Sequence, residues 1–145
     1  MLRQDAGLGK APEKTMSRAS LIAVVDDDWL FRDSMRSLLS SLGYIVEDFA
    51  SAADFVASPR LVETACLIAD VQMPVMTGLE LSRHLIDTGY AIPTILITAY
   101  PNDSDRAQAL NGGVVCYLRK PVDQNDLIRC LDNALSSAGI PNDEP

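Results

Sequence analysis

The sequence predicts an α/β domain built from five β-α units, with a parallel sheet covered by helices on both faces. From Leu21 onward, apolar runs of four to six residues alternate with segments of helical periodicity, and the alternation repeats five times. The apolar runs are nearly continuous, which is typical of strands that are buried on both faces of a parallel sheet. The chain has 145 residues and 48% apolar content, enough for one domain with a real core.

The strands are defined by short apolar runs bounded by polar residues, glycine or proline. In chain order they are expected at 21–25, about 44–49, 66–70, 93–98 and 114–118.

The helices are defined by apolar residues at helical spacing and by stop signals at their ends. In chain order they are expected at about 29–42, about 52–58, between Gly78 and Gly89, at about 103–111 and at about 123–136. Gly43, Gly89 and Gly112-Gly113 supply left-handed stops, and Pro59 helps to end the second helix. The apolar positions expected to face the core are Leu30, Met35, Leu38, Leu39 and Leu42 in the first helix, Leu79, Leu81, Leu85 and Ile86 in the third, and Leu127, Ile128, Leu131 and Leu135 in the fifth.

The remaining parts of the chain and its bulk charge narrow the possible functions. Residues 1–19 are expected to form a flexible arm, 20–137 the domain, and 138–145 a tail or truncated linker with no output domain after it. The net charge of -8 argues against nucleic-acid binding by this chain, because phosphate backbones are bound by clustered Lys and Arg. No run approaches the ~20 apolar residues of a membrane span, and no signal peptide is evident, so we expect a cytoplasmic protein.

The three cysteines carry no recognisable pairing signal. Cys66, Cys116 and Cys130 sit singly inside apolar patterns, without a C-x-x-C pair or a metal-ligand spacing. We expect all three to be buried, reduced thiols.

Chemically active side chains stand at the ends of four predicted strands. They are the run Asp26-Asp27-Asp28 after the first strand, Asp70 at the end of the third, Thr98 at the end of the fourth and Lys120 just beyond the fifth. The carboxyl edge of an open parallel sheet is where ligands bind, so these groups are expected to converge on one small site. Carboxylates gathered there repel by about 4 kcal/mol per pair at 4 Å, which a divalent cation and the Lys120 ammonium would offset. Asp28 is expected to cap the following helix, but capping does not explain the other three strand ends.

Four short segments, taken in order, resemble the receiver domain of bacterial two-component response regulators, which has the chemotaxis-regulator-like fold. The segments are Val25-Asp26-Asp27 with Arg32 downstream, Asp70-x-x-Met73-Pro74 with Gly78, Ile97-Thr98-Ala99, and Lys120-Pro121. The resemblance covers about residues 20–137 and looks closest to the FixJ-like subgroup. It implies a doubly wound (βα)5 fold with strand order 2-1-3-4-5, and it makes a cis Lys120-Pro121 bond an expectation.

The resemblance implies that Asp70 is the phosphoacceptor. Its carboxylate would take a phosphoryl group from a sensor histidine kinase or a phosphotransfer protein. Such a domain is not a conventional enzyme, although it takes part in its own phosphorylation and dephosphorylation. The implied cofactor is Mg²⁺, with Mn²⁺ able to substitute, held by Asp27 and Asp70, by Asp26 partly through water, and by the backbone carbonyl of Gln72.

The resemblance also implies roles around the phosphoryl group. Thr98 and Lys120 resemble the residues that contact its oxygens, and the small Ala99 would leave room for the phosphoryl group and a water. Tyr117 resembles a switch aromatic that turns inward when Thr98 moves toward the site. That change would reshape the surface of the last two helices and the last strand, altering self-association or the binding of a downstream protein. Pro101 restricts the loop that moves in this scheme, so switching is expected to be muted.

Three alternative functions remain to be weighed. A haloacid-dehalogenase-like phosphohydrolase also uses an Asp nucleophile, but its nucleophile lies in the first strand and it needs a later acidic pair. A flavodoxin-like cofactor binder is disfavoured because three carboxylates would repel a phosphate in the first loop. The third alternative is a receiver-like scaffold that binds partners without being phosphorylated, with Pro101 holding one conformation.

Overall fold

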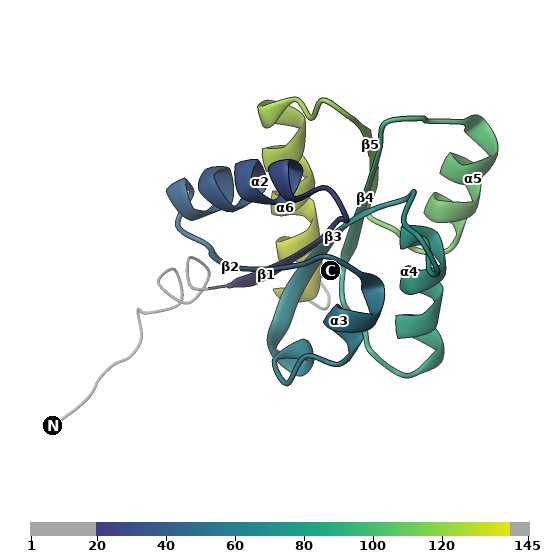
Figure 1. Ribbon diagram of the computed structural model, residues 1–145, viewed down its shortest axis with the longest axis horizontal. Coiled ribbons are helices and arrows are strands. Elements are labelled where there is room, and N and C mark those ends of the chain that lie inside the picture. The colour runs from purple at the N-terminus through teal and green to yellow at the C-terminus, as the bar shows by residue number, and fades with distance from the viewer. Residues whose placement is uncertain (1–19, 140–145) are drawn as a thin grey trace, which may run out of the picture.

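The computed structural model describes residues 20–139, which fold into one α/β sandwich (Figure 1). The expected arm at 1–19 and residues 140–145 of the expected tail lie outside the described residues. Within 20–139, no helix is both long and apolar enough to cross a membrane.

The sheet has five parallel strands in the expected order, β2-β1-β3-β4-β5. Their bounds are Leu21–Val25 for β1, Ile45–Phe49 for β2, Thr64–Asp70 for β3, Thr94–Thr98 for β4 and Cys116–Arg119 for β5. The central strands β1 and β3 are flanked on both sides, which is why their apolar runs are continuous. The order places the ends of β1 and β3 side by side at the middle of the sheet, with β4 next to β3.

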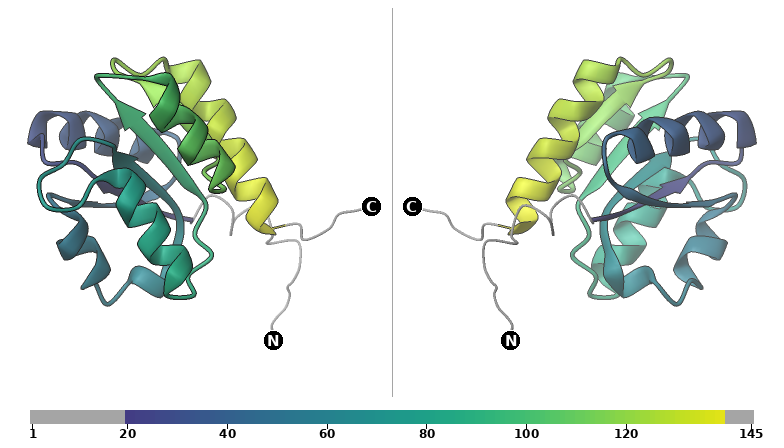
Figure 2. Two further views of the ribbon diagram at one scale, coloured as in Figure 1. Left: turned by 90° about the vertical axis from the view of Figure 1, so that its right-hand side faces the viewer. Right: turned by 90° about the vertical axis from the view of Figure 1, so that its left-hand side faces the viewer.

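Helices cover both faces of the sheet (Figure 2). One face carries α2 (Trp29–Ser41) and α6 (Gln124–Gly139). The other carries α3 (Ala52–Val56), α4 (Gly78–Asp87) and α5 (Asp103–Asn111). A short 3-10 turn at Leu61–Glu63, which was not expected, leads into β3.

Alternate residues of each strand feed two separate cores. Ile22 and Val24 of β1 pack with Met35, Leu39 and Leu127 beneath α2 and α6. On the opposite face lies a second cluster, which includes Ala23, Val25, Phe55, Leu67, Leu81, Leu85, Leu96 and Tyr117. Burial of both faces holds the strand ends, and therefore the site, on a rigid platform.

Two apolar residues that were expected to face the core are exposed instead, and a third apolar side chain, Trp29, is exposed as well. Leu30 is 62% exposed because it is offset from the Phe31-Met35-Leu39 stripe that faces the sheet. Ile86 is exposed for the same reason, since α4 buries Leu81 and Leu85 instead. Trp29, at the start of α2, is also mostly in solvent and does not pack into the core.

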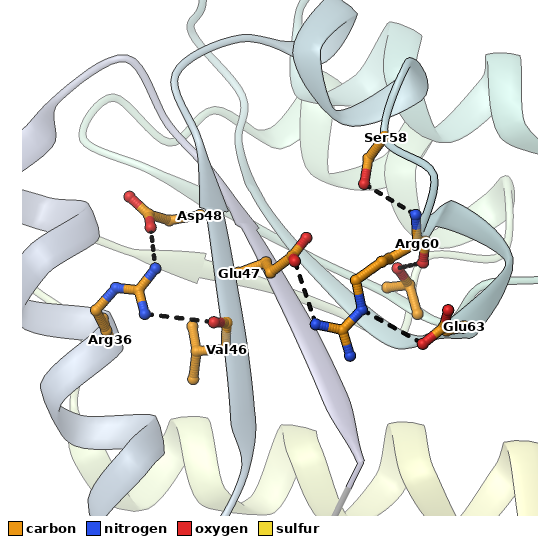
Figure 3. Close-up of polar contacts among 8 residues, drawn as sticks. Arg36, Val46, Glu47, Asp48, Ser58, Arg60 and Glu63 are labelled. Carbon is orange, nitrogen blue, oxygen red and sulfur yellow. Dashed lines mark hydrogen bonds and ion pairs between the residues drawn. The ribbon is translucent and has the colours of Figure 1, made fainter.

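The edge strand β2 is held by arginines on both of its faces (Figure 3). Arg36 of α2 pairs with Asp48 and donates to the Val46 carbonyl at 3.4 Å. On the other side, Arg60 pairs with Glu47 at 3.2 Å and with Glu63 at 3.3 Å. Charged side chains along an edge strand also discourage pairing with a further chain.

The expectation of three reduced cysteines is wrong for two of them. Cys116 of β5 and Cys130 of α6 form a disulfide, with Cα atoms 6.1 Å apart. The pair arises from the packing of α6 across β5, a tertiary contact that local cysteine spacing does not reveal. Cys66 is the free, buried cysteine, and burial raises its pKa to about 12.

Candidate functional site

The backbone brings the four expected strand ends together at the carboxyl edge of the sheet. Asp70 is the last residue of β3 and pairs with Ile97 of β4, one residue before Thr98. The Lys120 N–H donates to the Thr98 carbonyl at 2.8 Å, which fixes the lysine beside β4. The convergence expected from the sequence is therefore confirmed by the fold.

Three carboxylates form a tight acidic cluster. One oxygen from each of Asp26, Asp27 and Asp70 lies within 4.8 Å of the other two. Asp26 is fully buried and Asp70 is 7% exposed, whereas Asp27 faces solvent. The cluster is thus open on one side only.

Lys120 is the cation of this site, and it pairs more closely with Asp26 than with Asp70. Its Nζ lies 2.8 Å from Asp26 Oδ2 and 3.6 Å from Asp70 Oδ2. The ammonium also sits 4.3 Å from the centre of the Phe31 ring. Burial lowers the pKa of Lys120, but the hydrogen bond and charge of Asp26, with those of Asp70, outweigh burial, so the pKa is raised.

Asp70 resists ionisation in this setting. Burial, together with the charges of Asp26 and Asp27, raises its pKa to about 6, although Lys120 and the Gln72 N–H oppose the shift. The carboxylate form is therefore costly, and added positive charge would stabilise it.

Thr98 is fully buried, and its hydroxyl is already bonded. It donates to the side-chain Oε1 of Gln72 at 2.5 Å and accepts from the Tyr100 N–H at 3.0 Å. Gln72 also donates its backbone N–H to Asp70 Oδ1 at 3.3 Å. Residue 72 thus contacts both Asp70 and Thr98.

The Tyr117 side chain points into the core. Its ring is 7% exposed and belongs to the core cluster under α3, α4 and α5. Its hydroxyl accepts the Asn102 N–H at 3.4 Å, next to Pro101. The ring borders a cavity of about 330 Å³ that is also lined by Arg106 and Arg119. Ala99 is exposed beside Thr98.

The loop after β3 is shaped by Gly78 and Val75. A Cβ on Gly78 would lie 2.4 Å from the Asp70 carbonyl oxygen, so only glycine allows α4 to start this close to the site. The Gly78 N–H donates to the Val71 carbonyl at 3.1 Å. Val75, at the exposed tip of the loop, has φ 71°, a strained conformation for a β-branched residue.

The first loop is ordered by its own acids and by Arg32. Asp28 caps α2 by accepting the Leu30 N–H at 3.0 Å, as expected. Arg32 donates to the Asp26 carbonyl at 2.7 Å and to Asp48 at 2.9 Å. The acidic loop is therefore tied to the edge strand β2. The Lys120-Pro121 peptide bond is cis, as expected.

The donor set fits a small, hard divalent cation. The oxygens of Asp26, Asp27 and Asp70 are carboxylate ligands of the kind that Mg²⁺ prefers, and the exposed side of the cluster leaves room for water ligands. The raised pKa of Asp70 is the electrostatic cost that such a cation would relieve.

Comparisons with known proteins identify the family. Residues 22–132 match the response regulator receiver domain family, and the chain belongs to that family. Response regulator protein TodT of Pseudomonas putida is 35% identical over 135 residues, which cover 90% of this chain and 60% of that protein. Response regulator MprA of Mycobacterium avium is 41% identical over 110 residues, covering 74% of this chain and 47% of that protein. The chain thus spans about half to three-fifths of these two relatives.

Solved structures agree with this assignment. The crystal structure of FixJ-N matches with a TM-score of 0.74 and 31% identity, covering 81% of this chain and 94% of that one. A CheY-like receiver domain from Methanospirillum hungatei matches with a TM-score of 0.75 and 28% identity, covering 83% and 97%. The expected family and its fold are confirmed.

The sequence located each site residue but not all of its contacts. Asp26, Asp27, Asp70, Thr98 and Lys120 lie together as expected. The contact of the Gln72 side chain with Thr98 was not expected, since the resemblance implies a role for the Gln72 backbone carbonyl alone. A long amide two residues after Asp70 is the sequence feature that would have indicated it.

Proposed function

We propose that this receiver domain accepts a phosphoryl group on Asp70 from a histidine kinase or a phosphotransfer protein. The observation that supports this most directly is the arrangement of Asp70 between two further carboxylates and Lys120 at an open sheet edge. In the reaction, a carboxylate oxygen of Asp70 bonds to phosphorus while the phosphorus–nitrogen bond of the donor phosphohistidine breaks. The electron pair leaves with the imidazole, and Asp70 becomes an acyl phosphate.

The proposed Mg²⁺ would be held by Asp27, Asp70 and the Gln72 carbonyl, with Asp26 contributing partly through water. When bound, it would neutralise charge on the carboxylates and on the phosphoryl oxygens. The side chains around Asp70 would contact the phosphoryl group and leave it an approach. Lys120 is near enough to Asp70 to contact a phosphoryl oxygen there, and the exposed Ala99 leaves an approach open.

Charge stabilisation is the main chemical contribution expected of such a site. The transferring phosphoryl group spreads negative charge over three oxygens, so fixed donors lower the barrier more than covalent chemistry by the protein does. Lys120 supplies a full positive charge, and the Thr98 hydroxyl supplies a donor once it is released from Gln72. Phosphorylation would then be read out through the surface of α5, β5 and α6, beneath which Tyr117 is buried.

That surface would bind a downstream protein or a second copy of the chain. Arg106, Arg119 and Asp103 line the cavity beside Tyr117, and the two arginines outnumber the one carboxylate, so an acidic partner segment is favoured there. This partner would sense phosphorylation through the loop from Thr98 to Asn102, which joins the site to the Tyr117 hydroxyl.

The test is phosphorylation by acetyl phosphate with Mg²⁺, followed by intact mass measurement. The wild-type chain is expected to gain one phosphoryl group and Asp70→Asn none, because an amide is not a nucleophile of this kind. Asp87→Asn, at the exposed end of α4, is the matched control and is expected to label like wild type. Full labelling of Asp70→Asn would contradict the proposal.

A phosphorylation-independent scaffold is the second candidate, and one observation favours it. Tyr117 is already buried, and its hydroxyl is bonded to Asn102 beside Pro101. This is the arrangement expected if Pro101 holds the domain in one conformation. If wild type fails to label with acetyl phosphate and with a phosphorylated kinase, the scaffold becomes the better account.

A further inference from the structure

The hydrogen bonds that the Thr98 hydroxyl makes in this structure leave it no proton to donate to a phosphoryl group. It is fully buried, it donates to Gln72 Oε1 at 2.5 Å, and it accepts from the Tyr100 N–H at 3.0 Å. A hydroxyl carries a single proton, so it cannot donate to Gln72 and to a phosphoryl oxygen at the same time. Binding a phosphoryl group therefore requires the Gln72 bond to break.

Gln72 is well placed to make and release this bond. Its backbone is anchored to Asp70 through the 3.3 Å bond from its N–H to Oδ1. The residue is exposed, so water can take over the amide when it swings away. Breaking the bond therefore costs only the net free energy of one hydrogen bond, since water replaces Thr98 as the partner of the amide.

Tyr117 is already buried, so the group that must change its contacts on phosphorylation is Thr98. The ring is buried and its hydroxyl is bonded to Asn102, so the aromatic occupies the inward position in this structure. What distinguishes the resting arrangement is the engagement of Thr98 by Gln72.

We propose that the Gln72 side chain is a positioning residue that holds the Thr98 hydroxyl in the resting state and competes with the phosphoryl group for it. This inference rests on the proposed function, because it assigns the resting partner of a group that the phosphoryl oxygens would recruit. Gln72 then sets how readily the Thr98 hydroxyl becomes available, both to the transferring phosphoryl group and for switching.

The size of the effect follows from the loss of one hydrogen bond. Removing the Gln72 acceptor should shift the equilibrium toward the released Thr98 by about fivefold, which corresponds to roughly 1 kcal/mol. Apparent affinity for a phosphoryl mimic rises by the same factor when the competent state becomes more populated.

The first test is a double-mutant cycle on the metal-free protein without any phosphoryl donor. Gln72→Met keeps the length of the side chain and the backbone carbonyl but removes the acceptor, and Thr98→Val removes the donor with a shape that is nearly the same. The unfolding midpoints should show that Gln72→Met lowers stability in the wild-type background and has no effect in the Thr98→Val background. Equal effects in the two backgrounds would overturn the proposal.

The second test measures switching directly and does not need Thr98→Val to fold. Beryllofluoride with Mg²⁺ is titrated while amide NMR shifts of Thr98 and its neighbours are followed. Gln72→Met should bind about fivefold more tightly than wild type. Gln124→Met, an exposed glutamine on α6, is the matched control and should bind like wild type. Unchanged affinity in Gln72→Met would overturn the proposal.

The two tests separate this inference from the proposed function. The cycle needs neither metal nor phosphate, so its failure counts against the Gln72 bond alone. If the cycle shows the coupling but the protein binds no beryllofluoride, the Gln72–Thr98 hydrogen bond is supported. The switching role of Gln72 and the phosphoacceptor function of Asp70 are then both contradicted.

Discussion

Lys120 pairs more closely with Asp26 than with Asp70: its Nζ is 2.8 Å from an Asp26 oxygen and 3.6 Å from an Asp70 oxygen. Asp26 is fully buried, so the ammonium compensates a carboxylate that water cannot reach. Asp70 keeps an oxygen that the lysine engages less strongly. The lysine therefore supports the fold of the resting site and remains close enough to meet a phosphoryl oxygen.

Replacing Lys120 is expected to affect both stability and phosphorylation. Lys120→Met keeps an apolar stem against Phe31 but leaves the Asp26 carboxylate with the Asp28 N–H as its remaining hydrogen-bond donor, so the metal-free protein should lose about 1–3 kcal/mol. Labelling by acetyl phosphate should slow, because a fixed positive charge is lost. Arg119→Met, one residue earlier and exposed, is the control for loss of charge. Chemical denaturation and labelling rates measure both effects, and wild-type values for Lys120→Met in both assays would be contrary to this account.

The raised pKa of Asp70 predicts a pH-dependent effect of Asp70→Asn in metal-free protein. The pKa is about 6 when folded and about 3.9 when unfolded, so between these values the folded state binds more protons and wild-type stability falls as pH rises. The variant lacks this loss. It should match wild type near pH 4 and exceed it by about 1–2 kcal/mol at pH 7, after discounting for solvent screening at the open edge. Denaturant midpoints from pH 4 to pH 7 test this, and a constant difference would contradict it.

Mg²⁺ is expected to stabilise the wild-type chain. Binding with modest affinity to the folded state alone adds about 1–1.5 kcal/mol at a concentration about ten times the dissociation constant. Thermal melts with and without millimolar Mg²⁺ measure the gain. Asp27→Asn should reduce it, whereas Asp33→Asn, an exposed acid on α2, should not. An unchanged midpoint for wild type would count against the metal site.

Gly78 is expected to be intolerant of any side chain. A Cβ there meets the Asp70 carbonyl oxygen at 2.4 Å, so Gly78→Ala must push α4 away from the end of β3. The expected cost is about 1–3 kcal/mol, together with slower phosphorylation. Gly112→Ala is a milder comparison, because its nearest contact is 3.1 Å. If both variants melt at the wild-type temperature, the close approach is not structurally important.

The disulfide is expected to stabilise the domain. Cys116 and Cys130 are 14 residues apart in sequence, and closing a loop of that length contributes about 3 kcal/mol in the chain-entropy account. Reduction, or the double change of both cysteines to serine, should therefore lower the melting temperature by several degrees. Cys66→Ser is the control, because it measures the effect on stability of changing a buried cysteine that forms no disulfide. A reducing agent that leaves the wild-type melting temperature unchanged would show that the bond does not stabilise the fold.

The sequence predicted the sheet and the site because both depend on local patterns. Continuous apolar runs define the buried strands, and the residue that follows each run necessarily lies at the same edge of a parallel sheet. Asp70 and Thr98 could therefore be placed together without knowledge of any tertiary contact. Helical periodicity predicted less well which apolar residues of a helix face the core, because Leu30 and Ile86 were expected there and are exposed.

Three other features could not be predicted, because they depend on how elements pack or on which rotamer a side chain takes. The Cys116–Cys130 bond requires α6 to lie across β5 in one register. The Gln72–Thr98 bond requires a side chain to fold back over the site. The inward position of Tyr117 is likewise set by the loop that contains Asn102. Each is a long-range contact with no periodic signature.

The most direct test of the central claim, phosphorylation of Asp70, is to locate the modified residue chemically. The wild-type chain is treated with acetyl phosphate and Mg²⁺, then with borohydride, which reduces an acyl phosphate on aspartate to homoserine, and the residue is identified by peptide mass spectrometry. The account predicts homoserine at position 70 and at no other aspartate. Homoserine at Asp26 or Asp27, or a phosphate that survives hydroxylamine, would contradict it.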